Sequence, residues 1–193
     1  MNFQHNVSDQ YNKIARQYEL TDEAIAKKYS FGPSFIRLCK QAPGRRMIDV
    51  ACGSGYGTRF LAKNCFPKNL MGLDVSLKMI TLACSHEKES PLGIIYLLGD
   101  VIDFNFSSVK PVDIITALFL LHYAKSKEEL LLICKSIYDA LTSTGTFITI
   151  TSNPKRPITS HKKYEIKSTL SKGKEESIRI ATYWRNGKKL CSF

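Results

Sequence analysis

The sequence lacks a run of apolar residues long enough to cross a membrane. Its longest apolar-rich stretch, from Ile114 to Leu121, is far shorter than the roughly 20 residues that a membrane-spanning helix needs. The first ten residues, MNFQHNVSDQ, also lack the basic and then apolar profile of a secretory signal peptide. We therefore expect a cytoplasmic protein that acts without a membrane partner.

The six cysteines include no CxxC pair and no Cys/His cluster at the spacing of zinc ligands. We expect no metal site, and we interpret the cysteines as reduced and mostly buried. They are Cys39, Cys52, Cys65, Cys84, Cys134 and Cys191. Cys52 lies in a glycine-rich segment, but no paired histidine is in view to activate it, so packing is favoured over a nucleophilic role.

Acidic residues are scarce at the C-terminal end of the chain. Residues 1–150 contain 17 basic and 14 acidic side chains, whereas residues 151–193 contain 11 and 3. Most of the net charge of +11 therefore belongs to the tail. Such a tail is more often a solvated surface than a binding site. The alternative that it binds an anionic partner such as nucleic acid stays open.

Short apolar segments alternate with helical patterns between residues 43 and 153. The expected strands are RMIDVA, NLMGLDVS, GIIYLLGD, VDIITALFLL and TFITITS; the helices between them include TRFLAKNC, LKMITLACSHEKE and SKEELLLICKSIYDALTST, the last capped by Gly145. Ser126 and Glu129 have the spacing of a capping box. This alternation predicts an α/β fold with a doubly wound, mostly parallel sheet.

Two different segments flank this core within a single domain. We expect residues 1–42 to form helices that cover the core. Ser8 or Asp9 would be the N-cap of the first helix, and Gly32-Pro33 would end the first helical pattern. Residues 154–193 alternate like strands around the hairpin signal Asn186-Gly187, which predicts an antiparallel meander. The last segment ends almost as soon as it begins, so we expect a truncated form of the fold.

The most informative segment is IDVACGSGYGT, residues 48–58, in which three glycines follow a buried strand. A dinucleotide fingerprint needs G-x-G-x-x-G, but here the third glycine comes one residue early, and the phosphate-loop lysine is absent. The glycine spacing alone does not exclude the alternative that the protein is a nicotinamide-dependent oxidoreductase. Asp74 and Asp100 follow the next two strands, so the three features meet at the carboxyl edge of the sheet, where such folds bind ligands.

IDVACGSGYGT resembles motif I of the class I S-adenosylmethionine-dependent methyltransferases, and MGLDVSLKMI resembles the acidic motif after their second strand. LLGDV, DIITALFLLHY and LTSTGTFITI are similar to the segments at strands three, four and five. YNKIARQYE resembles the Tyr-x-x-Ile-Ala-x-x-Tyr stretch of small-molecule methyltransferases, including the ubiquinone-biosynthesis and toxoflavin-synthase-like groups. The resemblance covers roughly residues 11 to 151 and implies a Rossmann-like methyltransferase fold.

The resemblance also implies a set of residues for S-adenosylmethionine. Asp49 would lie near the amino group, Gly53 and Gly55 along the methionine and ribose, and Asp74 at both ribose hydroxyls. The full expected set is Tyr11, Tyr18, Asp49, Ala51, Gly53, Gly55, Asp74, Val75, Met79, Asp100, Val101, Ala117 and Leu118. Ala51 replaces the glycine of the commonest form of motif I. Simple core packing stays open for Tyr11 and Tyr18.

Methyl transfer from a sulfonium is an in-line displacement, so the protein mainly aligns the donor with the acceptor. His122 and Tyr123 are the candidates for a general base, with a structural histidine as the alternative. Thr116-Ala117-Leu118-Phe119 stands where amine-methylating DNA enzymes resemble one another in an Asp/Asn-Pro-Pro-Tyr/Phe motif, which favours a small-molecule acceptor. An RNA or protein acceptor and a catalytically inactive cofactor-binding protein stay open, as does the oligomeric state.

Overall fold

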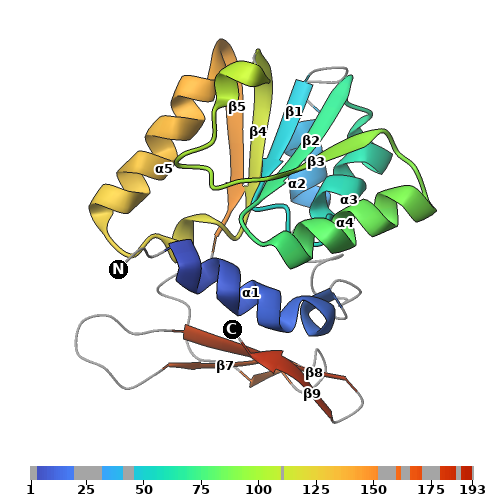
Figure 1. The fold of residues 1–193 in the computed structure, drawn as a ribbon, viewed down its shortest axis with the longest axis vertical. Helices are drawn as coiled ribbons and strands as arrows, with labels where there is room; N and C mark the ends of the chain where they lie inside the picture. The colour runs from blue at the N-terminus through green and yellow to red at the C-terminus, as the bar shows by residue number, and fades with distance from the viewer. Residues whose placement is uncertain are drawn as a thin grey trace.

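The computed structural model describes residues 4–19, 32–40, 46–109, 111–151, 160–161, 166–170, 179–185 and 188–192. The last four ranges are described by their backbone. Figure 1 shows a sheet with helices on both faces, the N-terminal helix below its lower edge and a second small sheet beneath that helix. The predicted α/β architecture is confirmed.

The central sheet has the strand order β3-β2-β1-β4-β5, and all four pairings are parallel. Its strands are β1 (Arg46–Val50), β2 (Asn69–Asp74), β3 (Ile94–Leu98), β4 (Val112–Leu118) and β5 (Leu141–Ile150). Strand order reverses between the neighbours β1 and β4, which is the place where sheets of this kind bind ligands. The glycine loop follows β1 and therefore lies at this reversal.

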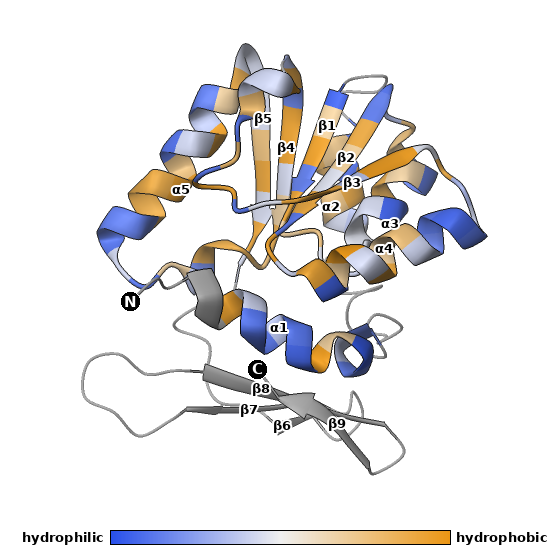
Figure 2. Cartoon of the chain, viewed as in Figure 1, coloured by the Kyte–Doolittle hydropathy of each residue, from blue (hydrophilic) through white to orange (hydrophobic). Residues whose placement is uncertain are grey.

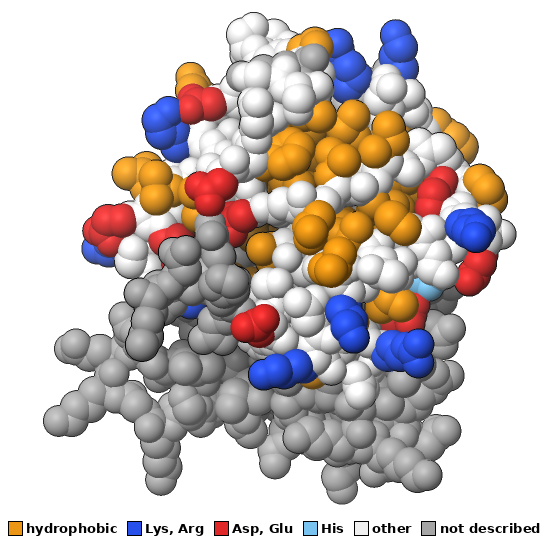
Figure 3. Space-filling model, in the orientation of Figure 1, with side chains coloured by type: hydrophobic (Ala, Val, Ile, Leu, Met, Phe, Trp, Pro, Cys, Tyr) orange, Lys and Arg blue, Asp and Glu red, His pale blue; other side chains and the backbone are white. Residues whose placement is uncertain are grey.

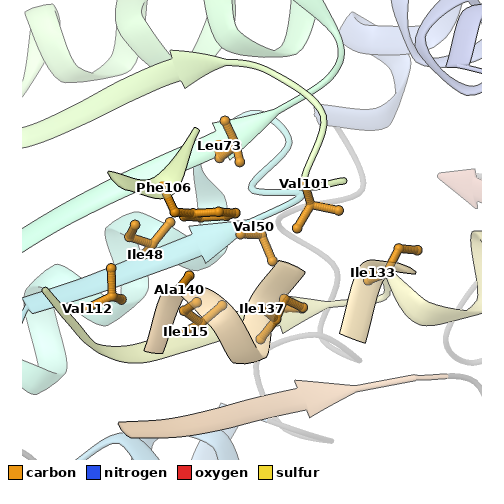
Figure 4. Packing of buried hydrophobic residues seen from close by; sticks show 11 residues of the cluster. Ile48, Val50, Leu73, Val101, Phe106, Val112, Ile115, Ile133, Ile137 and Ala140 are labelled. Atoms are coloured by element: carbon orange, nitrogen blue, oxygen red, sulfur yellow. The ribbon is translucent and has the colours of Figure 1, made fainter. Parts of the chain in front are cut away.

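Two hydrophobic clusters cover the two faces of the sheet because its central strands are apolar throughout. The helices are α2 (Gly32–Cys39), α3 (Tyr56–Cys65), α4 (Leu77–Glu89) and α5 (Lys127–Ala140). Phe35 and Leu61 bring α2 and α3 onto one face, while Ile133 and Ile137 bring α5 onto the other. Figure 4 shows the second cluster, in which α5 packs on β1 and β4. Figure 2 shows the strands mainly hydrophobic and the helices carrying hydrophilic stretches.

The end of α5 corrects one expectation from the sequence. The helix ends at Ala140 instead of continuing to Gly145, and Leu141 is already extended and paired with Val112. The amide of Leu141 closes the helix on the carbonyls of Ile137 and Tyr138. The β-branched threonines of LTSTGTFITI favour a strand, and the register of β4 with β5 shifts there. Gly145 therefore lies within a strand irregularity, not at a helix cap.

The N-terminal helix α1 (Gln4–Glu19) starts earlier than expected, so neither Ser8 nor Asp9 is its N-cap. Ser8 instead donates a hydrogen bond to the carbonyl of Val75 after β2. Gly32-Pro33 begins α2, which suits proline in a first helical turn, where its missing amide costs nothing. The end of the first predicted helical pattern, residues 20–31, lies outside the described residues.

The predicted antiparallel meander is present in the backbone. Its strands are β6 (Ser160–His161), β7 (Ile166–Leu170), β8 (Arg179–Arg185) and β9 (Lys188–Ser192), in that order and all antiparallel. The hairpin signal Asn186-Gly187 falls outside the described residues. Strand β9 contacts α1, so α1 is held between this small sheet and α4.

Two surface features complete the fold. Figure 3 shows hydrophobic side chains gathered on the face of the central sheet that is visible there, and the edge strand β3 exposes Ile95 and Leu98 by 53% and 51%. Cys39, Cys52 and Cys65 are buried, as expected for most of the cysteines, whereas Cys84 and Cys134 are exposed. Within the described ranges, no helix is both long and apolar enough to span a bilayer.

Candidate active site

The glycine loop between β1 and α3 has an unusual backbone. Ala51, Gly53 and Gly55 all have positive φ, at 56°, 58° and 85°. Glycine accepts such values freely, whereas alanine in this region is strained by about 1–2 kcal/mol. This explains why glycine is the commoner residue at the position of Ala51. The loop turns sharply enough to present bare backbone at the carboxyl end of β1.

Asp74 holds the loop against β2. Its carboxylate accepts a hydrogen bond from the amide of Gly53 at 2.8 Å and another from the amide of Ser76 at 2.8 Å. Burial raises the pKa of Asp74, and these backbone amides counteract that rise. Cys52 and Leu73 reinforce the contact through a backbone bond of 3.1 Å. The acidic residue thus fixes the loop from the neighbouring strand, in the register that the sequence predicts.

Asp49 is a second buried carboxylate and joins three elements. It accepts hydrogen bonds from the hydroxyls of Thr58 on α3 and Thr116 on β4, each at 2.7 Å. Burial raises the pKa of Asp49 to about 6, although both hydroxyls oppose this shift. Neither threonine was singled out from the sequence, because an interaction between residues 49 and 116 becomes visible only once β1 and β4 are known neighbours.

The titration of Asp49 predicts a pH-dependent stability. Because the folded pKa of about 6 lies above the usual 3.8, the native state favours the protonated acid. The resulting stabilisation is complete below about pH 4 and is lost as the pH rises through 6; a shift of this size corresponds to roughly 2–3 kcal/mol. We expect Asp49→Asn to equal the wild type near pH 4 and to exceed its melting temperature increasingly up to pH 7.5. A difference that stays constant with pH would contradict this assignment.

A pocket opens beside these carboxylates. It is lined by Tyr18, Asp49, Ala51, Cys52, Gly53, Ser54, Tyr56, Gly57, Leu118 and Phe119. Five of these residues, Tyr18, Asp49, Ala51, Gly53 and Leu118, belong to the set expected from the sequence. Tyr56 and Phe119 were missed, and Phe119 is notable because its φ of 64° is strained for a non-glycine residue. The amide of Phe119 donates to the carbonyl of Ile150, which holds that conformation.

The aromatic residues of α1 close one side of the site. Tyr11 lies edge-to-face with Tyr18, at a centroid distance of 5.4 Å, and its hydroxyl is hydrogen-bonded to that of Tyr123. Burial raises the pKa of both Tyr11 and Tyr123, so these hydroxyls stay protonated at neutral pH. Both tyrosines are half-buried, and Tyr18 also lines the pocket. Core packing therefore stays open for Tyr11, whereas Tyr18 is placed at the site.

His122 lies on the short turn after β4. Its ring is 4.5 Å from that of Tyr123 and 6.2 Å from that of Phe119, and its Nδ1 is 3.5 Å from the hydroxyl of Thr151. Partial desolvation of the ring lowers the pKa of His122, although much of the residue is exposed. A neutral imidazole at pH 7 has the protonation state that a general base needs.

The remaining expected residues lie outside the pocket lining. Met79 is almost fully buried on α4, and its amide donates to the N-cap hydroxyl of Ser76. Val101 and Ala117 belong to the hydrophobic core. Asp100 follows β3 and accepts from the amide of Ile102. From these positions the residues would contact a cofactor through their backbone or from the edge of the sheet. Such contact stays a prediction.

The side chain of Tyr96 on β3 packs closely against Gly55 of the glycine loop and Gly72 of β2. A Cβ atom on Gly72 would lie 2.6 Å from its ring, and one on Gly55 would lie 2.5 Å from its hydroxyl oxygen. The two glycines therefore make room for this tyrosine. Its buried hydroxyl has no hydrogen-bond partner within the part of the chain that the structure describes.

The unpaired hydroxyl of Tyr96 predicts a stabilising substitution. Leaving a buried donor unsatisfied costs about 1–3 kcal/mol, so Tyr96→Phe is expected to raise the free energy of unfolding by about 1 kcal/mol. Urea denaturation measures this change. Tyr138→Phe is the matched control, because Tyr138 is 78% exposed and its substitution is expected to have no effect. A loss of stability in Tyr96→Phe would show that the hydroxyl has a partner in solution.

The family profile described as a methyltransferase domain matches residues 48–149, which is more than half of the chain and contains most of the residues described above. The chain belongs to the methyltransferase domain family. The match includes the glycine loop, Asp49 and Asp74. It agrees with the class I methyltransferase membership predicted from the sequence.

Individual relatives extend this result. Phosphoethanolamine N-methyltransferase 3 of Arabidopsis thaliana is 36% identical over 52 residues, which span 27% of this chain but a tenth of that protein. A S-adenosylmethionine-dependent methyltransferase of Clostridium acetobutylicum is 18% identical over 100% of this chain and 79% of its own, with a TM-score of 0.62. The second similarity confirms the predicted Rossmann-like methyltransferase fold.

A third relative is phosphoethanolamine N-methyltransferase 2 of Haemonchus contortus, bound to phosphomonomethylethanolamine and S-adenosylhomocysteine. It is 22% identical, and the alignment covers 63% of this chain and 28% of the other, with a TM-score of 0.54. The product of the cofactor thus occupies a protein of the same fold. For this chain, the similarity shows the fold.

Proposed function

We propose that this protein transfers a methyl group from S-adenosylmethionine to a small-molecule acceptor, with the pocket beside the glycine loop holding the methionine end of the cofactor. The observation that carries the proposal is the way the loop amides are used. The amide of Gly53 is bonded to Asp74 and that of Gly55 to the carbonyl of Cys52. A phosphate-binding loop needs such amides for its ligand.

The charges at the site agree with this choice. Asp49 lines the pocket beside the first turn of α3, where a phosphate would otherwise be favoured. Two buried carboxylates repel a pyrophosphate but attract a ligand that carries an ammonium and a sulfonium. The residues present therefore fit S-adenosylmethionine better than a nicotinamide dinucleotide. Asp74 would hold the ribose hydroxyls and Asp49 the amino group.

When bound, S-adenosylmethionine supplies an electrophilic methyl group and a neutral thioether as leaving group. The protein aligns the acceptor and excludes water. Tyr18, Tyr56 and Phe119 provide apolar walls for this purpose. If the acceptor must lose a proton, His122 is the better base and Tyr123 the better hydrogen-bond donor, because their pKa values shift in opposite directions.

A small-molecule acceptor is supported by the N-terminal tyrosine stretch and by relatives whose names specify phosphoethanolamine. Within the family, we propose a branch similar to the ubiquinone-biosynthesis and toxoflavin-synthase-like enzymes, acting in the cytoplasm. The basic tail keeps RNA or protein as a less favoured acceptor.

A labelling screen tests the proposed function. The protein is incubated with methyl-labelled S-adenosylmethionine and a metabolite extract, with an RNA fraction and a protein fraction in parallel. Label in a small molecule is expected, and Asp74→Ala should abolish it. Label confined to RNA or protein would overturn the acceptor class. Binding of the cofactor without labelling of any fraction would identify an inactive cofactor-binding protein.

A further inference from the structure

His86 on α4 connects the two segments that enclose the proposed cofactor pocket. Its Nδ1 is 3.2 Å from the carbonyl oxygen of Ser54, in the glycine loop. Its Nε2 is 2.6 Å from Oε1 of Glu19, the last residue of α1. Tyr18, which precedes Glu19, lines the pocket. The His86 side chain therefore joins the glycine loop to the end of α1, and both of these segments contribute residues to the pocket.

Both partners of His86 are hydrogen-bond acceptors when Glu19 is ionised. A neutral imidazole has one N–H and can donate to one of them, so both contacts together require an additional proton. That proton lies either on the imidazole, giving a charge-assisted pair, or on the glutamic acid, which then donates to the ring. In both cases the closed arrangement contains one proton more than neutral His86 with ionised Glu19.

We propose that His86 is a positioning residue of the cofactor site, and that its shared proton with Glu19 holds α1 against the glycine loop around bound cofactor. The inference rests on the proposed function, since it concerns the affinity for S-adenosylmethionine. By linkage, a closed state that contains an extra proton binds the cofactor more weakly as the pH rises.

Among the described residues, the other hydrogen bonds given for α1 to the core join neutral groups. Asn12 accepts hydrogen bonds from the hydroxyl of Ser76 and the amide of Lys78, which fastens the middle of α1 to the start of α4. These neutral bonds keep α1 in place when the proton is lost. The proposed effect is therefore a loosening of the end of α1 that carries Tyr18, not its detachment.

The charged residue that follows His86 in the sequence has partners other than the imidazole. Glu87, the next residue on α4, pairs with Arg59 of α3 at 2.7 Å and also accepts from the amides of Leu92 and Ile94. Among the described contacts from α1, Glu19 supplies the charged group that reaches the ring. Asp49, whose pKa burial raises to about 6, and Asp74 are unchanged in every variant, so their titration contributes equally to all of them.

The test compares calorimetric affinities for S-adenosylmethionine between pH 6 and pH 8.5 in three variants. Both side chains of the pair are about one-third exposed, so we expect the wild-type affinity to fall by about tenfold at most over this range. In Glu19→Gln, the amide can donate to a neutral ring that still donates to Ser54. This variant should therefore lose the part of the pH dependence that comes from the shared proton, and it should bind more tightly than wild type at pH 8.5.

His86→Phe should bind about tenfold more weakly than wild type at pH 6, with an affinity no longer dependent on this proton. Asp139→Asn, which removes an exposed ion pair with Lys135 on α5, is the control and should follow the wild type. A Glu19→Gln variant that is as weak as His86→Phe, or a wild-type profile that His86→Phe does not change, would overturn the inference. Failure of the wild type to bind at any pH would instead overturn the proposed function.

Discussion

Replacing Gly55 by alanine is expected to abolish measurable binding of S-adenosylmethionine and to lower the free energy of unfolding by about 2–4 kcal/mol. The residue has a φ of 85°, which strains any side chain, and its Cβ would lie 2.5 Å from the hydroxyl oxygen of Tyr96 and 3.2 Å from the Cβ of Ala83. Either the loop or β3 must move. The loop would then no longer present its backbone beside Asp74.

Gly93 provides a matched control for this substitution. Its φ is 76°, but a Cβ there would meet nothing within 4 Å. Gly93→Ala therefore has backbone strain without a clash, and it should lose about 1 kcal/mol and bind the cofactor normally. Combining Gly55→Ala with Tyr96→Leu should recover part of the stability. Equal losses for Gly55→Ala and Gly93→Ala in urea denaturation would show that Tyr96 does not limit the loop.

Asp74→Ala is expected to weaken cofactor binding by at least about 100-fold. The carboxylate supports the loop through the amide of Gly53, and in our proposal it also accepts the ribose hydroxyls; hydrogen bonds to a charged group contribute about 1.5–3 kcal/mol each. Asp74→Asn retains one acceptor oxygen and should lie between the wild type and the alanine variant. Calorimetric titration measures all three affinities.

Asp113→Ala is the control for a general effect of removing a carboxylate. Asp113 lies near the opposite end of β4, where it accepts from the amide and guanidinium of Arg46. Its removal should affect stability and leave the affinity within about twofold of wild type. If Asp113→Ala and Asp74→Ala weaken binding equally while both remain folded by circular dichroism, Asp74 has no specific role at the ribose.

The parts of the fold that could be predicted from sequence are those in which local pattern and tertiary environment agree. Buried parallel strands need continuous apolar residues, so β1 and β4 are readable from RMIDVA and VDIITALFLL. The capping box is similarly local, and Ser126 does accept from the amide of Glu129. The position of Asp74 follows because a carboxylate at a strand end must lie at the edge of the sheet. These features position most of the candidate site.

The features that sequence reasoning missed depend on contacts between distant residues. Gly145 resembles a helix cap, but pairing of Leu141 with Val112 draws the chain into β5 before that residue is reached. The strained backbone of Phe119 is held by Ile150, and the two partners of His86 belong to other segments of the chain. No residue type or spacing within one segment signals such interactions. They become visible when the topology is known.

The most direct test of the central claim is calorimetric titration of the intact protein with S-adenosylmethionine, beside the reduced nicotinamide dinucleotide. We predict one saturable site for S-adenosylmethionine that is lost in Asp74→Ala, and no comparable site for the dinucleotide. Tight binding of the dinucleotide with no binding of S-adenosylmethionine would contradict the assignment of the pocket and return the glycine loop to a phosphate ligand.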